Sequence, residues 1–425
     1  MKRLFVLLLL ALSAQAQATL EITITGGEES AQPIAIVPFR NLDGQGFDIA
    51  KVIENDLSRT GLFKGLSRDA MLEKPYDIGQ VNYANWRSVS VDHVVLGQMT
   101  QGANGTIGAR FFLLDAVGGQ QLLGFDMPPV QPAQLRTLAH QIADLVFEKI
   151  TGTRGAFNTK IAYVAATGFG YQRRYELVVA DADGEVPRTV ATSREPLMSP
   201  AWSPDRSRLA FVGYEKGRSA IYVQTLQTGQ VVKLVSEKGI NGSPAWSPNG
   251  RRLLVTLSFE SNPDIYVMDA DGGNRLRLTD HYGIDTEGAW SPDGQDVVFT
   301  SDRGGSPQIY RISANGGTPE RLTFEGRQNL RASYSPDGKK LCLVHSDGKY
   351  RIALLDLDSK EITALTDGSL DESPQFAPNG AVIIYATQSG RSAELATISA
   401  DGRVRSRLRQ AGDVREPAWS PMATR

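Results

Sequence analysis

The chain has 425 residues, of which 41% are hydrophobic and 22% charged, and its formal net charge is −2 at pH 7. This composition excludes a disordered chain, and the length suggests two domains. A near-neutral charge with both signs interspersed excludes the basic surface that nucleic-acid binding requires, so we expect no nucleic-acid partner.

The first residues have the three regions of a secretory signal peptide. Lys2 and Arg3 supply the positive start, Leu4–Leu12 forms an apolar run, and Ala16–Ala18 offers a cleavage site of small residues. The apolar run is too short to remain as a membrane-spanning helix. We therefore predict a signal peptide over residues 1–18, cleavage after Ala18, and a soluble periplasmic protein that begins at Thr19.

Residues 33–152 alternate between strand and helix patterns. The predicted strands are Ile34–Phe39, His93–Met99 and a hairpin of Thr106–Asp115 with Gln121–Met127, and the predicted helices are Phe47–Leu57 and Leu135–Ile150. We expect a small α/β domain, without a phosphate loop or a dinucleotide fingerprint. The polar, Gly-containing stretch 153–158 marks its boundary.

The segment Thr19–Gln32 precedes this domain. Leu20, Ile22 and Ile24 alternate with polar residues as in a strand. Two interpretations remain open: a mobile strand that pairs with the sheet edge of a partner protein or folds back, or a plain edge strand of the α/β domain.

From Lys160 onward the chain repeats one phrase, Ala-Trp-Ser-Pro-Asp-Gly or a close variant. Its aromatic residue recurs every 42 to 44 residues, at Trp202, Trp246, Trp290, Tyr334, Phe376 and Trp419. Each copy leads into further short strands and a second tight turn such as Asp269–Gly272. A period of this length with four short strands is typical of a β-propeller blade.

The two ends of the repeat give the number of blades. The first unit, from Lys160, lacks the aromatic strand, whereas the last copy, at Trp419, is followed only by residues 420–425. The C-terminal strand must therefore complete the first blade, because an open ring would leave free strand edges. We predict a six-bladed β-propeller over residues 157–425.

Chain direction assigns the tight turns to one face of the ring and the longer, variable loops to the other, the top face. The blade-to-blade loops of the top face are predicted at Ser193–Ser199, Glu237–Ser243, His281–Glu287, Glu325–Arg331, Gly368–Ser373 and Gly412–Glu416. Carboxylates in these loops should make the mouth of the channel acidic: Asp285, Glu287, Asp371, Glu372 and Glu416. Such a rim favours a basic partner segment or a cation; the alternative is a merely solvated rim.

Catalytic and metal-binding patterns are weak. Gly217-Arg218-Ser219 and Gly390-Arg391-Ser392 lack the closing Gly of a nucleophile elbow, and the four histidines are scattered without zinc-site spacing. The Asp-x-Asp-Gly turns lack the Gly and Glu that close a calcium loop. We expect no cofactor and no catalytic residue. A lactonase-type or hydrolase-type propeller enzyme with calcium in the channel stays open as the alternative, on the acidic rim alone.

The signal peptide, the α/β domain and the six repeats together resemble the TolB family, the periplasmic propellers of the Tol–Pal system. Specific stretches are Val146–Gly152, Pro196–Asp205 and Leu370–Pro374, whereas Gln375–Ala377 and Ile240 depart from the family pattern. The resemblance implies a non-catalytic scaffold that supports outer-membrane integrity and constriction at division. It also implies that colicins and phage proteins can use the protein.

The same resemblance implies two partners. The first is the peptidoglycan-associated lipoprotein Pal, bound by the top face, where the matching positions are Ile240, Asn241, Ser243, Thr286 and Glu287, to which the acidic rim adds Asp371, Glu372 and Glu416. The second is the inner-membrane protein TolA, bound by the N-terminal segment through Leu20, Ile22 and Ile24.

Overall fold

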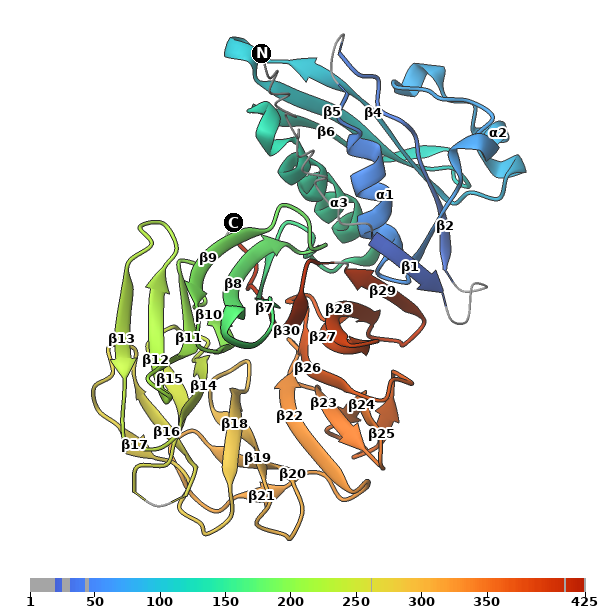
Figure 1. Cartoon of the computed structure of the whole chain (residues 1–425). Coiled ribbons are helices and arrows are strands. Elements are labelled where there is room, and N and C mark those ends of the chain that lie inside the picture. Colours follow the sequence, from blue (N-terminus) through green and yellow to red (C-terminus); the bar gives the residue numbers. More distant parts are fainter. Residues whose placement is uncertain (1–19, 25–30, 43–45, 261, 409, 424–425) are drawn as a thin grey trace, which may run out of the picture.

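The computed structural model describes residues 20–24, 31–42, 46–260, 262–408 and 410–423, arranged as an α/β domain beside a ring of small sheets (Figure 1). The predicted signal peptide and its cleavage site lie outside the described residues. Among the described residues, no helix has the length and apolar character needed to cross a membrane.

The N-terminal domain is a five-stranded mixed sheet of order β3-β2-β4-β5-β6. Its strands are β2 (Gln32–Ile36), β3 (Phe63–Gly65), β4 (His93–Gln101), β5 (Ile107–Asp115) and β6 (Gln120–Val130). β2 runs parallel to β3 and β4, and the remaining pairs are antiparallel. The strands and the two longer helices, α1 (Ile49–Ser58) and α3 (Leu135–Thr151), confirm the predicted α/β domain.

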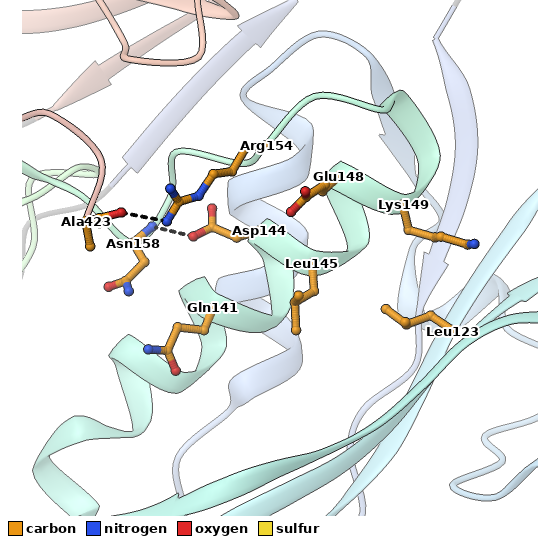
Figure 2. A pocket seen from close by; sticks show the side chains of 9 residues that line it. All are labelled: Leu123, Gln141, Asp144, Leu145, Glu148, Lys149, Arg154, Asn158 and Ala423. Atoms are coloured by element: carbon orange, nitrogen blue, oxygen red, sulfur yellow. Dashed lines mark hydrogen bonds between the residues drawn. The ribbon is translucent and has the colours of Figure 1, made fainter. Parts of the chain in front are cut away.

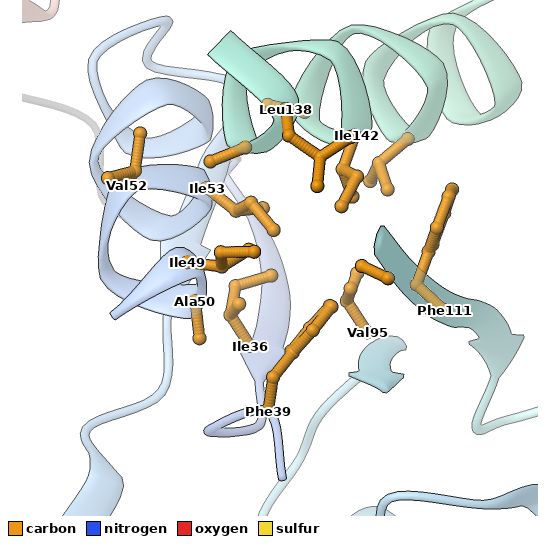
Figure 3. Packing of buried hydrophobic residues seen from close by; sticks show 14 of the residues in the cluster. Ile36, Phe39, Ile49, Ala50, Val52, Ile53, Val95, Phe111, Leu138 and Ile142 are labelled. Atoms are coloured by element: carbon orange, nitrogen blue, oxygen red, sulfur yellow. The ribbon is translucent and has the colours of Figure 1, made fainter. Parts of the chain in front are cut away.

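Both long helices pack on one face of this sheet (Figure 3). Ile49 and Ile53 of α1 and Leu138 and Ile142 of α3 are at most 1% exposed, and each contributes roughly 1.5–3 kcal/mol by burial. Asp48 caps the N-terminus of α1, because its side chain accepts a hydrogen bond from the Lys51 amide. A short helix that the sequence did not predict, α2 (Tyr83–Ser88), brings Trp86 to the opposite face.

The second domain is a six-bladed propeller closed by the C-terminal strand, as predicted. The first three blades are β30 (Asp413–Trp419), β7 (Lys160–Thr167), β8 (Arg174–Asp181) and β9 (Arg188–Ser193); β10 (Leu197–Trp202), β11 (Arg208–Glu215), β12 (Arg218–Thr225) and β13 (Val231–Val235); and β14 (Asn241–Trp246), β15 (Arg252–Leu257), β16 (Asp264–Asp269) and β17 (Leu276–Arg277). The last three are β18 (Asp285–Trp290), β19 (Asp296–Ser301), β20 (Gln308–Ser313) and β21 (Glu320–Arg321); β22 (Gln328–Tyr334), β23 (Lys340–Ser346), β24 (Tyr350–Asp356) and β25 (Ile362–Ala364); and β26 (Asp371–Phe376), β27 (Val382–Ser389), β28 (Ser392–Ser399) and β29 (Val404–Leu408).

The repeated phrase builds the turn after each innermost strand. In the fourth blade the Ser291 hydroxyl donates to Asp293 (2.6 Å) and accepts from the Asp296 amide (2.9 Å), and Gly294 takes a φ of 72°. The Trp290 indole donates to the Ala245 carbonyl of the preceding blade (3.1 Å). The Ser, Asp and Gly therefore fix the turn, and the Trp links neighbouring blades.

The N-terminal strand β1 (Leu20–Ile24) lies on the propeller (Figure 1). It pairs antiparallel with β29, from Leu20 opposite Leu408 to Ile24 opposite Val404, and becomes the fifth strand of the sixth blade. The interpretation as an edge strand of the α/β domain is therefore wrong. The outer edge of β29 has unpaired backbone groups that a short strand can satisfy.

Candidate protein-binding face of the propeller

The top face carries the loops between blades and the loops between the second and third strand of each blade. The opposite, bottom face carries the tight turns, and the α/β domain covers it at the first and sixth blades. Ala381 of a bottom turn packs into the core of that domain, and Arg136 of α3 contacts Asp181 at 3.3 Å. The top face is thus the face that the α/β domain leaves open.

Every innermost strand has a bulge at the same place. The register shifts lie between Met198/Ala201, Gly242/Ala245, Thr286/Ala289, Leu330/Ser333, Glu372/Gln375 and Arg415/Ala418. At each bulge one non-Gly residue adopts a left-handed backbone with φ between 46° and 58°: Ser199, Ser243, Glu287, Arg331, Ser373 and Glu416. Strained residues of this kind concentrate at functional sites. The six bulge residues around the channel therefore mark a candidate site.

The ring surrounds a central cavity of about 340 Å³, lined by the innermost strands of the blades. Across it, Arg331 of the fifth blade contacts Glu416 of the first at 2.5 Å, and the Ser199 amide of the second donates to the same carboxylate at 3.0 Å. Burial lowers the pKa of Arg331, but Glu416, Glu287 and Glu372 outweigh burial, so its pKa is raised. Burial raises the pKa of Glu416, and Arg331 and Ser199 reverse that effect.

The predicted acidic mouth is wrong in part, because two of its carboxylates are buried. Asp285 is 0% exposed and pairs with Arg303 at 2.7 Å, and Asp371 is 1% exposed and accepts from the Thr366 and Thr387 hydroxyls. The remaining ones are half-buried and engaged. Glu372 pairs with Arg415 (3.0 Å), Glu287 accepts from Thr300 (2.9 Å), and Glu416 pairs with Arg331. The channel therefore lacks a cluster of free carboxylates among the described residues.

Asn241 occupies the position equivalent to Asp285 and Asp371, at the start of an innermost strand, and is also 0% exposed. Its side-chain amide donates to the Ser219 and Glu237 carbonyls, at 3.0 and 2.8 Å, which closes the blade-to-blade loop. The prediction of Asn241 and Asp371 as partner contacts is therefore corrected. Their polar groups make hydrogen bonds inside the propeller.

The other predicted positions remain accessible, although most belong to strands instead of loops. Ile240 is 49% exposed on its loop. Ser243, Thr286, Glu287, Glu372 and Glu416 are half-buried on innermost strands beside the bulge. The sequence concealed this because the bulge interrupts the alternation by which a strand is recognised.

Exposed apolar side chains gather on the top face, which the sequence analysis missed. They are Phe169, Tyr171, Met198, Ile240, Phe259, Tyr282, Ile284, Phe324 and Leu370, with Tyr282 84% and Phe324 69% exposed. Exposed apolar and aromatic side chains in this number mark protein-binding surfaces. A count of aromatic residues in the variable loops would have found this signal.

Fold and geometry define the class: a six-bladed β-propeller with an N-terminal α/β domain, which covers the bottom face at two blades. Family models described as the TolB amino-terminal domain and the TolB beta propeller domain match residues 20–122 and 147–423. The chain belongs to the TolB family.

Individual relatives are similar in sequence to nearly the whole chain. The Tol-Pal system protein TolB of Thioalkalivibrio sulfidiphilus is 58% identical, covering 99% of this chain and 98% of the relative, and that of Nitrosococcus oceani is 57% identical, covering 98% and 97%. The crystal structure of TolB from Acinetobacter baumannii superposes with a TM-score of 0.87 at 41% identity, covering 96% of this chain and all of that one.

Proposed function

We propose that this chain is the TolB component of a Tol–Pal system in the periplasm. It acts as a non-catalytic scaffold that binds the lipoprotein Pal through its top face and TolA through its N-terminal strand. Through these contacts it supports outer-membrane integrity and constriction at division. The observation that carries the first contact is the rim of exposed apolar side chains on the face left open by the α/β domain.

The top face suits a protein partner better than a substrate or a cation. Its exposed aromatic residues surround a channel mouth whose charges already neutralise one another, as in the Arg331–Glu416 pair. A calcium ion would need several free oxygen ligands converging on one point. A folded protein that buries Ile240, Tyr282 and Ile284 needs only the apolar rim and the polar strand ends beside it.

β1 suits TolA binding because it is short and pairs with its sheet along one edge only. Among the described residues, its five residues pair with β29 alone. A strand of this kind can leave its sheet and add to the sheet edge of a partner, where backbone hydrogen bonds replace those to β29. We therefore propose that TolA binds β1 and that Pal binds the top face.

Thr286→Arg is expected to weaken Pal binding by about tenfold or more, because a long charged side chain at the half-buried rim position disrupts close packing. Isothermal titration calorimetry with the soluble domain of Pal measures the affinity. The matched control is Leu276→Arg on an outer strand, where the wild-type side chain is 49% exposed and away from the rim. Unchanged affinity of a folded Thr286→Arg protein contradicts the assignment of Pal to the top face.

A further inference from the structure

A buried histidine lies where α1, α3 and the first blade meet. His140 of α3 is 2% exposed, and its Nδ1 lies 2.5 Å from Oδ2 of Asp56 on α1. Its Nε2 faces the propeller, 3.8 Å from Oδ2 of Asp181 and 4.0 Å from Oδ2 of Asp183, at the end of β8 and the turn that follows. One imidazole ring thus faces carboxylates of both domains.

Further charged groups surround the ring from every element packed against it. Arg59 of α1 contacts Asp56 at 3.3 Å, Arg136 of α3 contacts Asp181 and Asp183, and Lys160 of β7 contacts Asp181. Asp144 of α3 interacts electrostatically with His140 and Asp56. Glu185, in the turn after β8, interacts with Arg136, Asp181 and Asp183. The set then holds five carboxyl groups, Asp56, Asp144, Asp181, Asp183 and Glu185, against four cations, Arg59, Arg136, Lys160 and a protonated His140. Without the proton on His140 the acidic excess would double.

Only the imidazolium form presents a proton to the carboxylates on both sides of the ring. Burial lowers the pKa of His140, but the charge and hydrogen bond of Asp56, together with Asp181 and Asp183, raise it to about 9. Asp56, His140 and Asp183 also have the spacing of a metal site. Arg136 already contacts Asp183 there, so a divalent ion would have to replace a cation that the protein supplies.

The same interface continues along α3 to the linker and the C-terminus (Figure 2). Asp144 accepts from the Phe157 amide at 2.7 Å and the Asn158 amide at 3.3 Å, and Arg154 donates to the Ala423 carbonyl at 2.8 Å. Asp144, Arg154, Asn158 and Ala423 form part of the lining of a cavity of about 570 Å³. These hydrogen bonds fix the linker, whereas the His140 cluster joins α1 to the first blade.

The turn after α1 comes close to the strand that holds β1. A Cβ at Gly61, three residues beyond α1, would lie 3.2 Å from Cγ2 of Val404, and Val404 pairs with Ile24 of β1. At the other end of the N-terminal segment, the Gln32 amide donates to the Leu62 carbonyl at 2.9 Å. Both places lie within four residues of the end of α1, so a shift of α1 would reach both of them.

We propose that the His140 imidazolium is an electrostatic latch that holds α1 against the first blade and thereby sets how firmly β1 is docked on the sixth. The biological consequence, control of TolA binding, rests on the proposed function; the latch itself does not. Since the pKa of His140 is raised from 6.5 to about 9, the latch is complete at neutral pH and is lost as pH rises through about 9.

The protonation state is tested by NMR on the mature full-length protein. The chain has only four histidines, so His93→Gln, His281→Gln and His345→Gln assign the remaining imidazole signals and serve as controls. We expect the His140 ring to carry protons on both nitrogens at pH 7.5 and to titrate near 9. A neutral ring at pH 7.5, or zinc bound at this ring in a titration with the metal alone, overturns the proposal.

Coupling to β1 is tested by hydrogen exchange of residues 20–24. His140→Gln is expected to speed this exchange by roughly 10- to 100-fold, as loss of a hydrogen bond to a charged group implies, whereas His345→Gln in the fifth blade leaves it unchanged. If His140→Gln does not fold, Asp183→Asn removes one carboxylate of the latch and is measured in the same way. Wild-type exchange in a folded variant overturns the coupling. Faster exchange with unchanged TolA binding keeps the latch and refutes the TolA assignment.

Discussion

Trp419→Ala is expected to lower the free energy of unfolding by about 3–5 kcal/mol. Trp419 is 5% exposed on the strand that closes the ring, and its indole donates to the Thr159 hydroxyl at 2.8 Å. It packs with Ile161 and Tyr163 of β7, its partner strand within the first blade. Truncation therefore removes a core side chain where β30 pairs with β7, the pairing that closes the ring.

Urea denaturation followed by circular dichroism measures this effect. Leu276→Ala is the matched control, because that side chain is 49% exposed on an outer strand and its truncation should change the free energy by no more than about 0.5 kcal/mol. A chain ending at Gly412 lacks β30 altogether and is expected not to form a stable propeller. Cooperative unfolding of that truncated chain at the wild-type urea concentration contradicts closure by the C-terminal strand.

Deletion of residues 19–24 is expected to abolish TolA binding while Pal binding and the melting of the propeller remain. β1 is bound to the propeller by one strand edge, so its removal leaves the four strands of the sixth blade paired as before. TolA would lose the strand that we propose adds to its sheet. A pull-down with the purified periplasmic part of TolA measures the loss.

Two controls separate strand pairing from general damage. Ile22→Pro keeps the length of the segment but removes a backbone donor and disfavours the extended pairing, so it should also lose TolA. Leu72→Ser changes an apolar side chain that is 62% exposed in the α/β domain and should bind TolA normally. TolA binding retained by the deletion variant refutes the role of β1.

The architecture was predictable because the residues that repeat in the sequence are the ones that form the repeated turn. Ser291, Asp293 and Gly294 close their turn with bonds that recur after Ser203, Ser247 and Ser335, so sequence identity at these positions reports a shared backbone. Closure followed from counting, since a missing first strand and a surplus last strand complete one blade. The helices and strands of the α/β domain followed from periodicity in the same way.

The site was predictable only in outline, because residue type does not tell which way a polar side chain faces. Asn241 and Asp371 look like loop residues open to a partner, yet both end a loop by bonding inward. Ile240 was placed correctly on an exposed loop. The left-handed bulge at Glu287 or Arg331 gives no sequence signal, because a non-Gly residue there is held by the sheet around it.

Contacts between distant segments also escaped prediction. The alternation in Leu20–Ile24 indicates a strand but not which edge receives it, and the edge is β29, at the opposite end of the chain. Asp56, His140 and Asp183 come from three separate elements, so neither their spacing in the sequence nor a motif predicts that they lie close together. The packing of one domain against the other determines such contacts. The pattern of hydrophobic and polar residues along the sequence does not predict this packing.

The central claim, that the top face of this propeller binds Pal, is tested most directly by a hydrogen-exchange footprint. The mature protein is compared with and without saturating soluble Pal domain. We predict protection in residues 236–246, 278–290 and 324–331, around Ile240, Tyr282, Ile284 and Phe324, with no change in the bottom turns that carry the Ser-Pro-Asp-Gly phrase. Protection confined to the bottom turns or to the α/β domain would contradict the account.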